Sequence, residues 1–335
     1  MAIDRSWVGT DDDGSGETGT VVNLAYMDAL LDAIDVAEAD TVAAITAGDA
    51  ATVAAVVDPR VCDGRLTLTT GVPVTTADVT AATTLYFTPY TGDRISLYSG
   101  SAWVSRTFTE KTLALGTLTT DLPYDVFAYD NAGAVALELL AWTSKTARAT
   151  AIVRQDGVYC KTGALTRRYL GTFHTTSTTT TEDSVAKRLL WNYANRVDRP
   201  LRVTQGGANS WTYTLATLRQ ARAAAGNQLA VVVGVAEVAI AVSVVGQFDN
   251  SGTGYAYVAI GEDSITAAHA ASVHALQTCP SANLAMAVTA ALRTLPAVGF
   301  HYYSWLEYAQ ATGTTTWYGL QGVGTLSGIT GVIPG

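Results

Sequence analysis

The residue types that carry most acid–base chemistry are scarce in this chain. Its four histidines are His174, His269, His274 and His301. His269 and His274 are five residues apart, and on a helix this spacing turns their side chains about 140° from each other. That separation is poor geometry for a shared metal ion. The histidines therefore predict no metal site.

One short segment combines an acid, a nucleophile and a base. Glu262, Asp263 and Ser264 are consecutive, and His269 follows five residues later. A hydrolase serine sits in a strand–Gly-x-Ser-x-Gly–helix context, which is missing here. Glycoside hydrolysis needs two carboxylates across a cleft, and the sequence has no β-helix repeat to present them. The sequence therefore predicts no catalytic residues and a protein that is not an enzyme.

The run Asp11–Asp13 before Gly14 is the best candidate for a calcium loop. An EF-hand loop needs acids at alternate positions before its glycine and a glutamate six residues after it. Here those positions fall on Gly9 at the start and Thr20 at the end. Two glycine-rich segments elsewhere lack the lysine of a phosphate loop, namely Gly206-Gly207 and Gly322-Val323-Gly324. The sequence predicts neither a metal nor a cofactor.

Composition narrows the classes of partner. The net charge is −9, only 15% of residues are charged, and no stripe of Lys and Arg appears. Such a chain is not expected to bind nucleic acid. The apolar run Leu229–Val242 is rich in valine and interrupted by Glu237, which predicts buried strands and no membrane insertion.

The cysteines indicate where the chain is assembled. They are widely separated in the sequence, at Cys62, Cys160 and Cys279, a spacing that fits neither a disulfide framework nor a metal knuckle. We expect buried thiols in a protein assembled in a reducing cytoplasm. No basic segment followed by an apolar one opens the sequence, so we expect no secretion signal.

The N-terminal 60 residues differ from the rest. Residues 1–20 are rich in Gly and acids, with Trp7 among their few large apolar side chains, and cannot bury enough apolar surface to order themselves. An amphipathic helix is predicted next, because one apolar stripe follows a 3-4-3 spacing at Leu24, Met27, Leu31 and Ile34. The pattern fades in Ala43–Ala55. The stripe packs either on its own domain or in a bundle of symmetry-related copies.

From residue 61 onward the pattern is that of short strands and turns. Ile95–Tyr98 and Ala102–Val104 flank a Ser-Gly-Ser turn, and Tyr124–Tyr129 and Val135–Leu139 flank another turn, so both pairs predict hairpins. The fold class is mainly β: a tail and helix (1–60) followed by two β-sandwich or jelly-roll domains, 61–199 and 200–335. Two segments stay open: Thr175–Thr181 as strand or loop, and Val185–Arg199 as a short helix or two strands.

Aromatic side chains crowd the C-terminal part of the chain. They are Tyr302, Tyr303, Trp305, Tyr308, Trp317 and Tyr318. Exposed together, they would suit a sugar or a protein interface. A place in a sheet core or a subunit interface is the alternative, and it is the simpler one.

Four stretches resemble the structural proteins of tailed-bacteriophage particles. They are the N-terminal segment Asp11–Asp35, the run Leu85–Arg106, the patterns between Tyr124 and Val197, and the C-terminal run Ser304–Gly331. The resemblance implies a modular fibre, spike or head-decoration protein of the virion. It also implies a homotrimer.

Several expectations follow from this resemblance. The chain would be a tail fibre, spike or receptor-binding component attached through its N-terminus, with Trp7 and the helix stripe as the anchor. Its partners would be other virion proteins and its own copies, with a host surface glycan as a candidate ligand. The alternatives are a capsid head fibre or decoration protein and, from another class, a spike enzyme that depolymerises host glycans.

Overall fold

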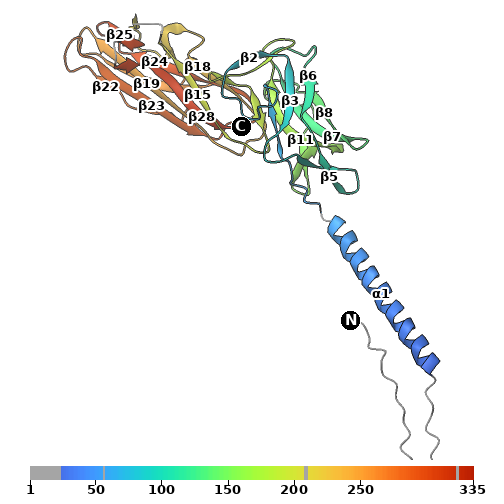
Figure 1. Ribbon diagram of the computed structural model, residues 1–335. Helices are drawn as coiled ribbons and strands as arrows, with labels where there is room; N and C mark the ends of the chain where they lie inside the picture. The colour runs from blue at the N-terminus through green and yellow to red at the C-terminus, as the bar shows by residue number, and fades with distance from the viewer. Residues whose placement is uncertain (1–23, 56, 207–209, 322–323) are drawn as a thin grey trace, which may run out of the picture. The chain divides into compact units, whose positions relative to one another are not determined.

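The computed structural model describes residues 24–55, 57–206, 210–321 and 324–335. Two compact units form, Met1–Val56 and Val57–Gly335, which we call the N-terminal unit and the β body. The described chain is mainly β, with one long helix, α1 (Leu24–Ala55). This confirms the predicted fold class (Figure 1). Trp7 and the acidic run Asp11–Asp13 lie outside the described residues.

The helix α1 begins where the apolar stripe was predicted and continues through the region where that stripe fades. Alanine explains the extra length, because it is the strongest helix former and recurs throughout Leu24–Ala55, while proline is absent there. The next proline is Pro59, and the residue before a proline disfavours helical dihedrals. Propensity therefore carries the helix further than the apolar pattern does.

The first half of the β body is built from three sheets. One pairs β1 (Gly64–Thr67), β3 (Thr84–Pro89) and β6 (Lys111–Ala114), and a second pairs β4 (Arg94–Tyr98) with β5 (Trp103–Thr107). The third has six strands: β8 (Ala134–Ala141), β7 (Pro123–Asn131), β11 (Ala164–His174), β10 (Val158–Lys161), β9 (Ile152–Gln155) and β14 (Leu190–Asn192). Both predicted hairpins are confirmed, as β4–β5 and β7–β8.

Two larger sheets dominate the second half. The eight-stranded sheet contains β2 (Val79–Ala82), β12 (Thr181–Asp183), β13 (Lys187–Arg188), β18 (Gln228–Val233), β24 (Gly299–Ala309), β20 (Tyr255–Glu262), β22 (Gln277–Thr278) and β17 (Arg219–Gln220). The seven-stranded sheet contains β15 (Asp198–Thr204), β28 (Gly328–Pro334), β19 (Ile240–Asn250), β23 (Met286–Thr294), β21 (Val273–His274), β16 (Ser210–Thr212) and β25 (Thr315–Tyr318). Smaller elements are β26 (Leu320–Gln321), β27 (Thr325–Leu326) and the 3-10 turn η1 (Ala221–Ala223).

These two sheets pack as a sandwich. Trp305 and Val258 from the eight-stranded sheet share one buried cluster with Val242 and Val288 from the seven-stranded sheet. The seven-stranded sheet alternates along β19, where Val242 and Val244 are buried while Ser243 is exposed. One of its faces therefore builds the core, and its other face points outward. In Figure 1 the strands β15, β28, β19 and β23 run side by side in the body.

The predicted boundary at 199/200 separates two hydrophobic cores but not two sheets. One core draws on residues 62–190 and the other on residues 201–333. A small third cluster joins Phe127, Tyr169 and Trp191 to Val232 of β18. In addition, β2, β12 and β13 belong to the eight-stranded sheet of the second half. The open segment Val185–Arg199 forms strands, and Thr175–Thr181 is mostly a turn that leads into β12.

Candidate functional site

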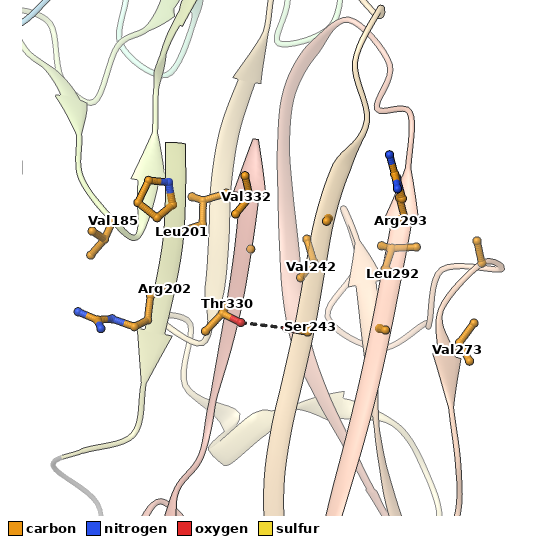
Figure 2. A pocket seen from close by; sticks show the side chains of 15 residues that line it. Val185, Leu201, Arg202, Val242, Ser243, Val273, Leu292, Arg293, Thr330 and Val332 are labelled. Carbon is orange, nitrogen blue, oxygen red and sulfur yellow. Dashed lines mark hydrogen bonds between the residues drawn. The ribbon is translucent and has the colours of Figure 1, made fainter. Parts of the chain in front are cut away.

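The outward face of the seven-stranded sheet carries a cavity of about 910 Å³. Strands β15, β28, β19 and β23 form its floor, and β21 forms one side. Figure 2 shows Ser243 and Thr330 in its middle, joined by a hydrogen bond, with Arg202 and Arg293 toward opposite sides. The lining contains no Asp, Glu, His or Cys. This cavity offers a surface for binding, but no acid, base or activated nucleophile.

The two arginines of this cavity have unused hydrogen-bonding capacity. Neither the Arg202 nor the Arg293 side chain makes a hydrogen bond or an ion pair within the described part of the chain, and both residues are exposed. Most other arginines of the body are paired, as in the buried bridges from Arg188 and Arg199 to Asp183. The cavity is therefore uncharged at its centre and cationic at its margin.

The acid–nucleophile–base segment is brought together only in part. His269 Nε2 lies 3.2 Å from Glu262 Oε2, but its Nδ1 accepts a hydrogen bond from the Ala271 amide. Ser264 Oγ accepts from the Ala267 amide at 2.9 Å, so the serine closes a local turn and has no base beside it. The predicted absence of catalytic residues stays a prediction.

Sequence reasoning missed the partner of Asp263, which is His301. His301 Nδ1 lies 2.7 Å from Asp263 Oδ2, and its Nε2 lies 3.0 Å from the Ala297 carbonyl. Both neighbours are acceptors, so both ring nitrogens donate and the imidazolium form is favoured. Burial alone would lower the pKa of His301, but Asp263 outweighs it and raises that pKa. A histidine held in this way cannot serve as a general base.

The pKa of Asp263 moves in the matching direction. Burial would raise it, yet the hydrogen bonds from His301 and the Tyr302 amide lower it overall. Nearby, the Tyr303 hydroxyl donates to Glu262 Oε1 at 3.0 Å. Every polar group of this cluster is thus committed to another, which is the pattern of a structural pair that joins β20 to β24 and not of a reactive site.

The predicted C-terminal aromatics are divided between core and surface. Tyr303, Trp305 and Trp317 are fully buried in the sandwich core, as the simpler of the two predictions for these aromatics expected, and these three are not part of an exposed ligand platform. Alternation along β24 and β25 turns these side chains inward, into the sandwich core. Tyr302, Tyr308 and Tyr318 are half-buried on the other side of the same strands.

Tyr308 belongs to a row of stacked rings that the sequence did not reveal. Tyr308 lies 4.6 Å from Tyr257 and 6.1 Å from Tyr255, centroid to centroid, and Tyr257 lies 5.1 Å from His274. The rings are nearly parallel, with interplanar angles of 7° to 19°. Neighbouring rings in this row cover part of one another's faces.

The helix stripe is exposed where its side chains are described. Met27 and Ile34 are each 42% exposed, and Leu31 is intermediate. Leu24 begins the helix, and Trp7 lies outside the described residues. The acids Asp28, Asp32, Asp35, Glu38 and Asp40 accompany the stripe, and α1 contains no Lys or Arg. Apolar side chains and acids are therefore exposed together on this helix, and Leu30 and Val36 are exposed away from the stripe.

The described residues lack metal-ligating groups, paired cysteines and membrane-spanning helices. They contain no group of three or more metal-ligating side chains, and the three cysteines are buried apart from one another. None of the described helices has the length and apolarity needed to cross a bilayer.

Comparisons with known proteins leave the family open. The sequence matches no family model and no curated protein. Among solved structures, the insecticidal delta-endotoxin Cry8Ea1 from Bacillus thuringiensis gives a TM-score of 0.25 at 5% identity, covering 81% of this chain and 51% of the toxin. A Bacillus thuringiensis Cry1Da tryptic core variant gives 0.20 at 8% identity, covering 85% and 54%. The chain spans about half the length of both, and likeness at this level carries no functional argument.

Proposed function

We propose that this chain is a non-enzymatic structural protein of a bacteriophage particle, attached through its N-terminal unit, with the β body as its projecting part. A tail fibre, spike or receptor-binding component is the preferred place. The observation that carries the proposal is the exposed apolar stripe of α1, in a unit that clusters separately from the β body. An apolar line of this kind is typical of a helix that lies in a groove of a partner.

The net charge of the N-terminal unit indicates what kind of surface α1 would bind. Eleven of the 29 Asp and Glu residues and one of the 20 Lys and Arg residues lie in residues 1–56, so this unit has a formal charge of −10 and the β body +1. A helix with this charge binds best to an apolar groove bordered by Lys or Arg. We therefore expect the attachment site on the particle to be basic.

The β body supports a binding role and not a catalytic one. Its best acid–base candidates, Glu262, Asp263 and His269, are engaged in hydrogen bonds, and Ser264 closes a turn. Its outward sheet face has no titratable group at the centre of the cavity. A host surface glycan stays a proposal for its ligand, without an assigned site.

Incorporation of variants into particles tests the proposal. The double variant Met27→Glu/Ile34→Glu places charge on the stripe, and Val36→Glu is the control, because Val36 is 61% exposed and lies nine residues from Met27, on the opposite side of the helix. We expect at least a tenfold loss of particle-bound chain for the double variant and normal incorporation for the control. Equal incorporation of both would contradict the proposal.

Two further assays separate the rival functions. Binding of purified chain to isolated tails supports the preferred place, whereas binding to empty capsids alone supports a head fibre or decoration protein. Release of reducing ends from a panel of host polysaccharides would replace the proposal with a depolymerising enzyme.

A further inference from the structure

The outward face of the seven-stranded sheet is an ordered grid of short side chains. Strand register places Arg202, Thr330, Ser243 and Ala291 in one cross-strand row, and Pro200, Val332, Ala241 and Arg293 in the next. A third row contains Thr204, Gly328, Val245 and Thr289. We call these three rows the outer grid. Within it, charge occurs only at one end of each of the first two rows.

The outer grid is exposed to solvent, although many of its side chains are apolar. Val245 is 51% exposed and Val332 is 39% exposed, and Val273 of β21 stands beside them with most of its surface exposed. The central hydroxyls of Ser243 and Thr330 lie 2.9 Å apart and form one hydrogen bond, in which either can donate. Burying this face would therefore remove apolar surface from water without burying a charge at its centre, and it would leave one hydroxyl hydrogen for an acceptor on the partner.

Two occupants fit the face poorly. A sugar is usually held by aromatic rings and convergent polar groups, and neither the 910 Å³ cavity nor the adjoining one of 370 Å³ is lined by Phe, Tyr or Trp. A membrane surface is unsuited to a flat sheet face whose margin carries only two arginines. A protein surface meets such a face best, because flat sheets of small side chains allow close approach of a second layer.

We infer that the outer grid is an interface between copies of this chain. Charge favours a second copy, because the β body has a formal charge of only +1 and its copies approach with little mutual repulsion. Arg202 and Arg293 stand at the margin, where arginine is common in interfaces and where exposed carboxylates of the neighbouring copy can pair with them. The N-terminal unit, at −10, opposes association of its own copies at neutral pH.

The size of the face indicates the kind of interface that it would form. Four strands spaced about 4.8 Å apart and about seven residues long cover on the order of 450 Å² of sheet area. Two such contributions come to roughly 900 Å² in total, which is the size of a weak, transient interface. Area alone does not set an affinity, so we expect weak, concentration-dependent association of the β body. This interface is independent of the attachment through α1, and a closed trimer, which the resemblance implies, would pair the grid with a different surface of the next copy.

Charge placed on the grid tests the interface. The full-length double variant Val245→Lys/Ala291→Lys changes two exposed side chains, and Val153→Lys is the control, since Val153 is also exposed on a strand but lies on β9. By sedimentation velocity over a dilution series up to roughly 50 μM, which suits a weak interface, we expect the unmodified chain and the control to associate as the concentration rises. The double variant should dissociate at least tenfold more readily, with unchanged thermal unfolding when fully dissociated.

Chemical labelling gives a second readout. Ser243→Cys adds a thiol at the centre of the grid, and Ser101→Cys adds one in the exposed β4–β5 turn, while the three native cysteines are buried. We expect maleimide to label Ser243→Cys at least tenfold more slowly than Ser101→Cys in concentrated protein, and equally fast after dilution. A monomeric unmodified chain, or grid variants that associate normally, would overturn the inference. Loss of host-cell binding with normal association would instead make the grid a receptor surface and also overturn it.

Discussion

The N-terminal unit and the β body both expose apolar side chains, but the charges around those side chains differ. On the helix α1, Met27 and Ile34 are exposed, and the only charged residues of the helix are acidic. On the β body, Val245 and Val332 are exposed next to uncharged residues. Their formal charges are −10 and +1. This difference motivates the two proposals made above. We propose that the helix surface binds a partner of opposite charge, and we infer that the sheet face binds a copy of this chain.

The two units also differ in what holds them together. The β body buries charges in specific networks, such as Asp125, which accepts hydrogen bonds from Arg148 and Thr172. The helix depends on alanine propensity and on local hydrogen bonds. Damage should therefore be large and cooperative in the β body, and small and local in α1.

The largest expected effect is the loss of a buried cation in the β body. Arg148→Met removes the partner of Asp125 at 2.7 Å and the hydrogen bond to the Gly234 carbonyl. Burial already raises the pKa of Asp125, so the carboxylate left alone should lower the free energy of unfolding by about 3–5 kcal/mol. Urea unfolding followed by tryptophan fluorescence measures this. Arg154→Met, which breaks an exposed pair with Glu237, should cost less than about 1 kcal/mol.

A large pH effect is expected from His174, which stacks on Phe300 in the β body. Burial lowers the pKa of His174 to about 4. The unfolded chain therefore binds this proton more readily, and stability should fall by about 3 kcal/mol as pH drops from 7 to 4. His301 acts with the opposite sign: its pKa is raised, so its contribution is full below about pH 6.5 and is lost as pH rises through the folded pKa.

Single variants separate these two histidines. His174→Gln should flatten the fall in stability between pH 6.5 and pH 4, and His301→Gln should remove the loss that accompanies rising pH. The N-terminal unit contains no histidine, so the helical signal of α1 should not change across pH 6–8. A change in that signal in this window would break the contrast between the units.

The smallest expected effects come from two alanine-to-glycine substitutions, one in each unit, that should change stability in opposite directions. Ala37→Gly in the middle of α1 should destabilise the helix by about 1 kcal/mol, seen by circular dichroism, and leave unfolding of the β body unchanged. Ala132 occupies a left-handed conformation, φ 51°, in the turn between β7 and β8. Ala132→Gly should therefore stabilise the β body slightly, by less than about 1 kcal/mol. The same sign at both positions would contradict this contrast.

Local sequence patterns predicted the strands, hairpins and helix, but they did not predict the contacts between residues far apart in the sequence. The two hairpins, the β18 and β19 strands and the start of α1 follow from alternation, turn residues and helical spacing over a few neighbours. The contact between His301 and Asp263 joins residues 38 apart, and Arg65 donates to the carbonyls of Asn195 and Gly335, 130 and 270 residues away. Such contacts depend on strand order, which a single sequence does not reveal.

The candidate surfaces were predicted unequally for the same reason. The stripe of α1 is a local periodic signal, and Met27, Leu31 and Ile34 could be read from it. The outer grid joins strands whose order is β15-β28-β19-β23-β21, and its residues are ordinary Ala, Ser, Thr and Val. The C-terminal aromatics left two alternatives open, and strand alternation, which places Tyr303, Trp305 and Trp317 in the core, agrees with the simpler one.

The division of labour between the two units is tested most directly by the sedimentation of residues 57–335, which form a compact unit with its own cores. This fragment would be expressed during particle assembly in place of the intact chain and followed through a sucrose gradient. We expect the fragment of residues 57–335 to stay out of the particle fractions and to sediment as an oligomer. A fragment that travels with particles as the intact chain does would contradict attachment through α1. A fragment that stays monomeric up to roughly 50 μM, a range suited to a weak interface, would contradict association through the outer grid.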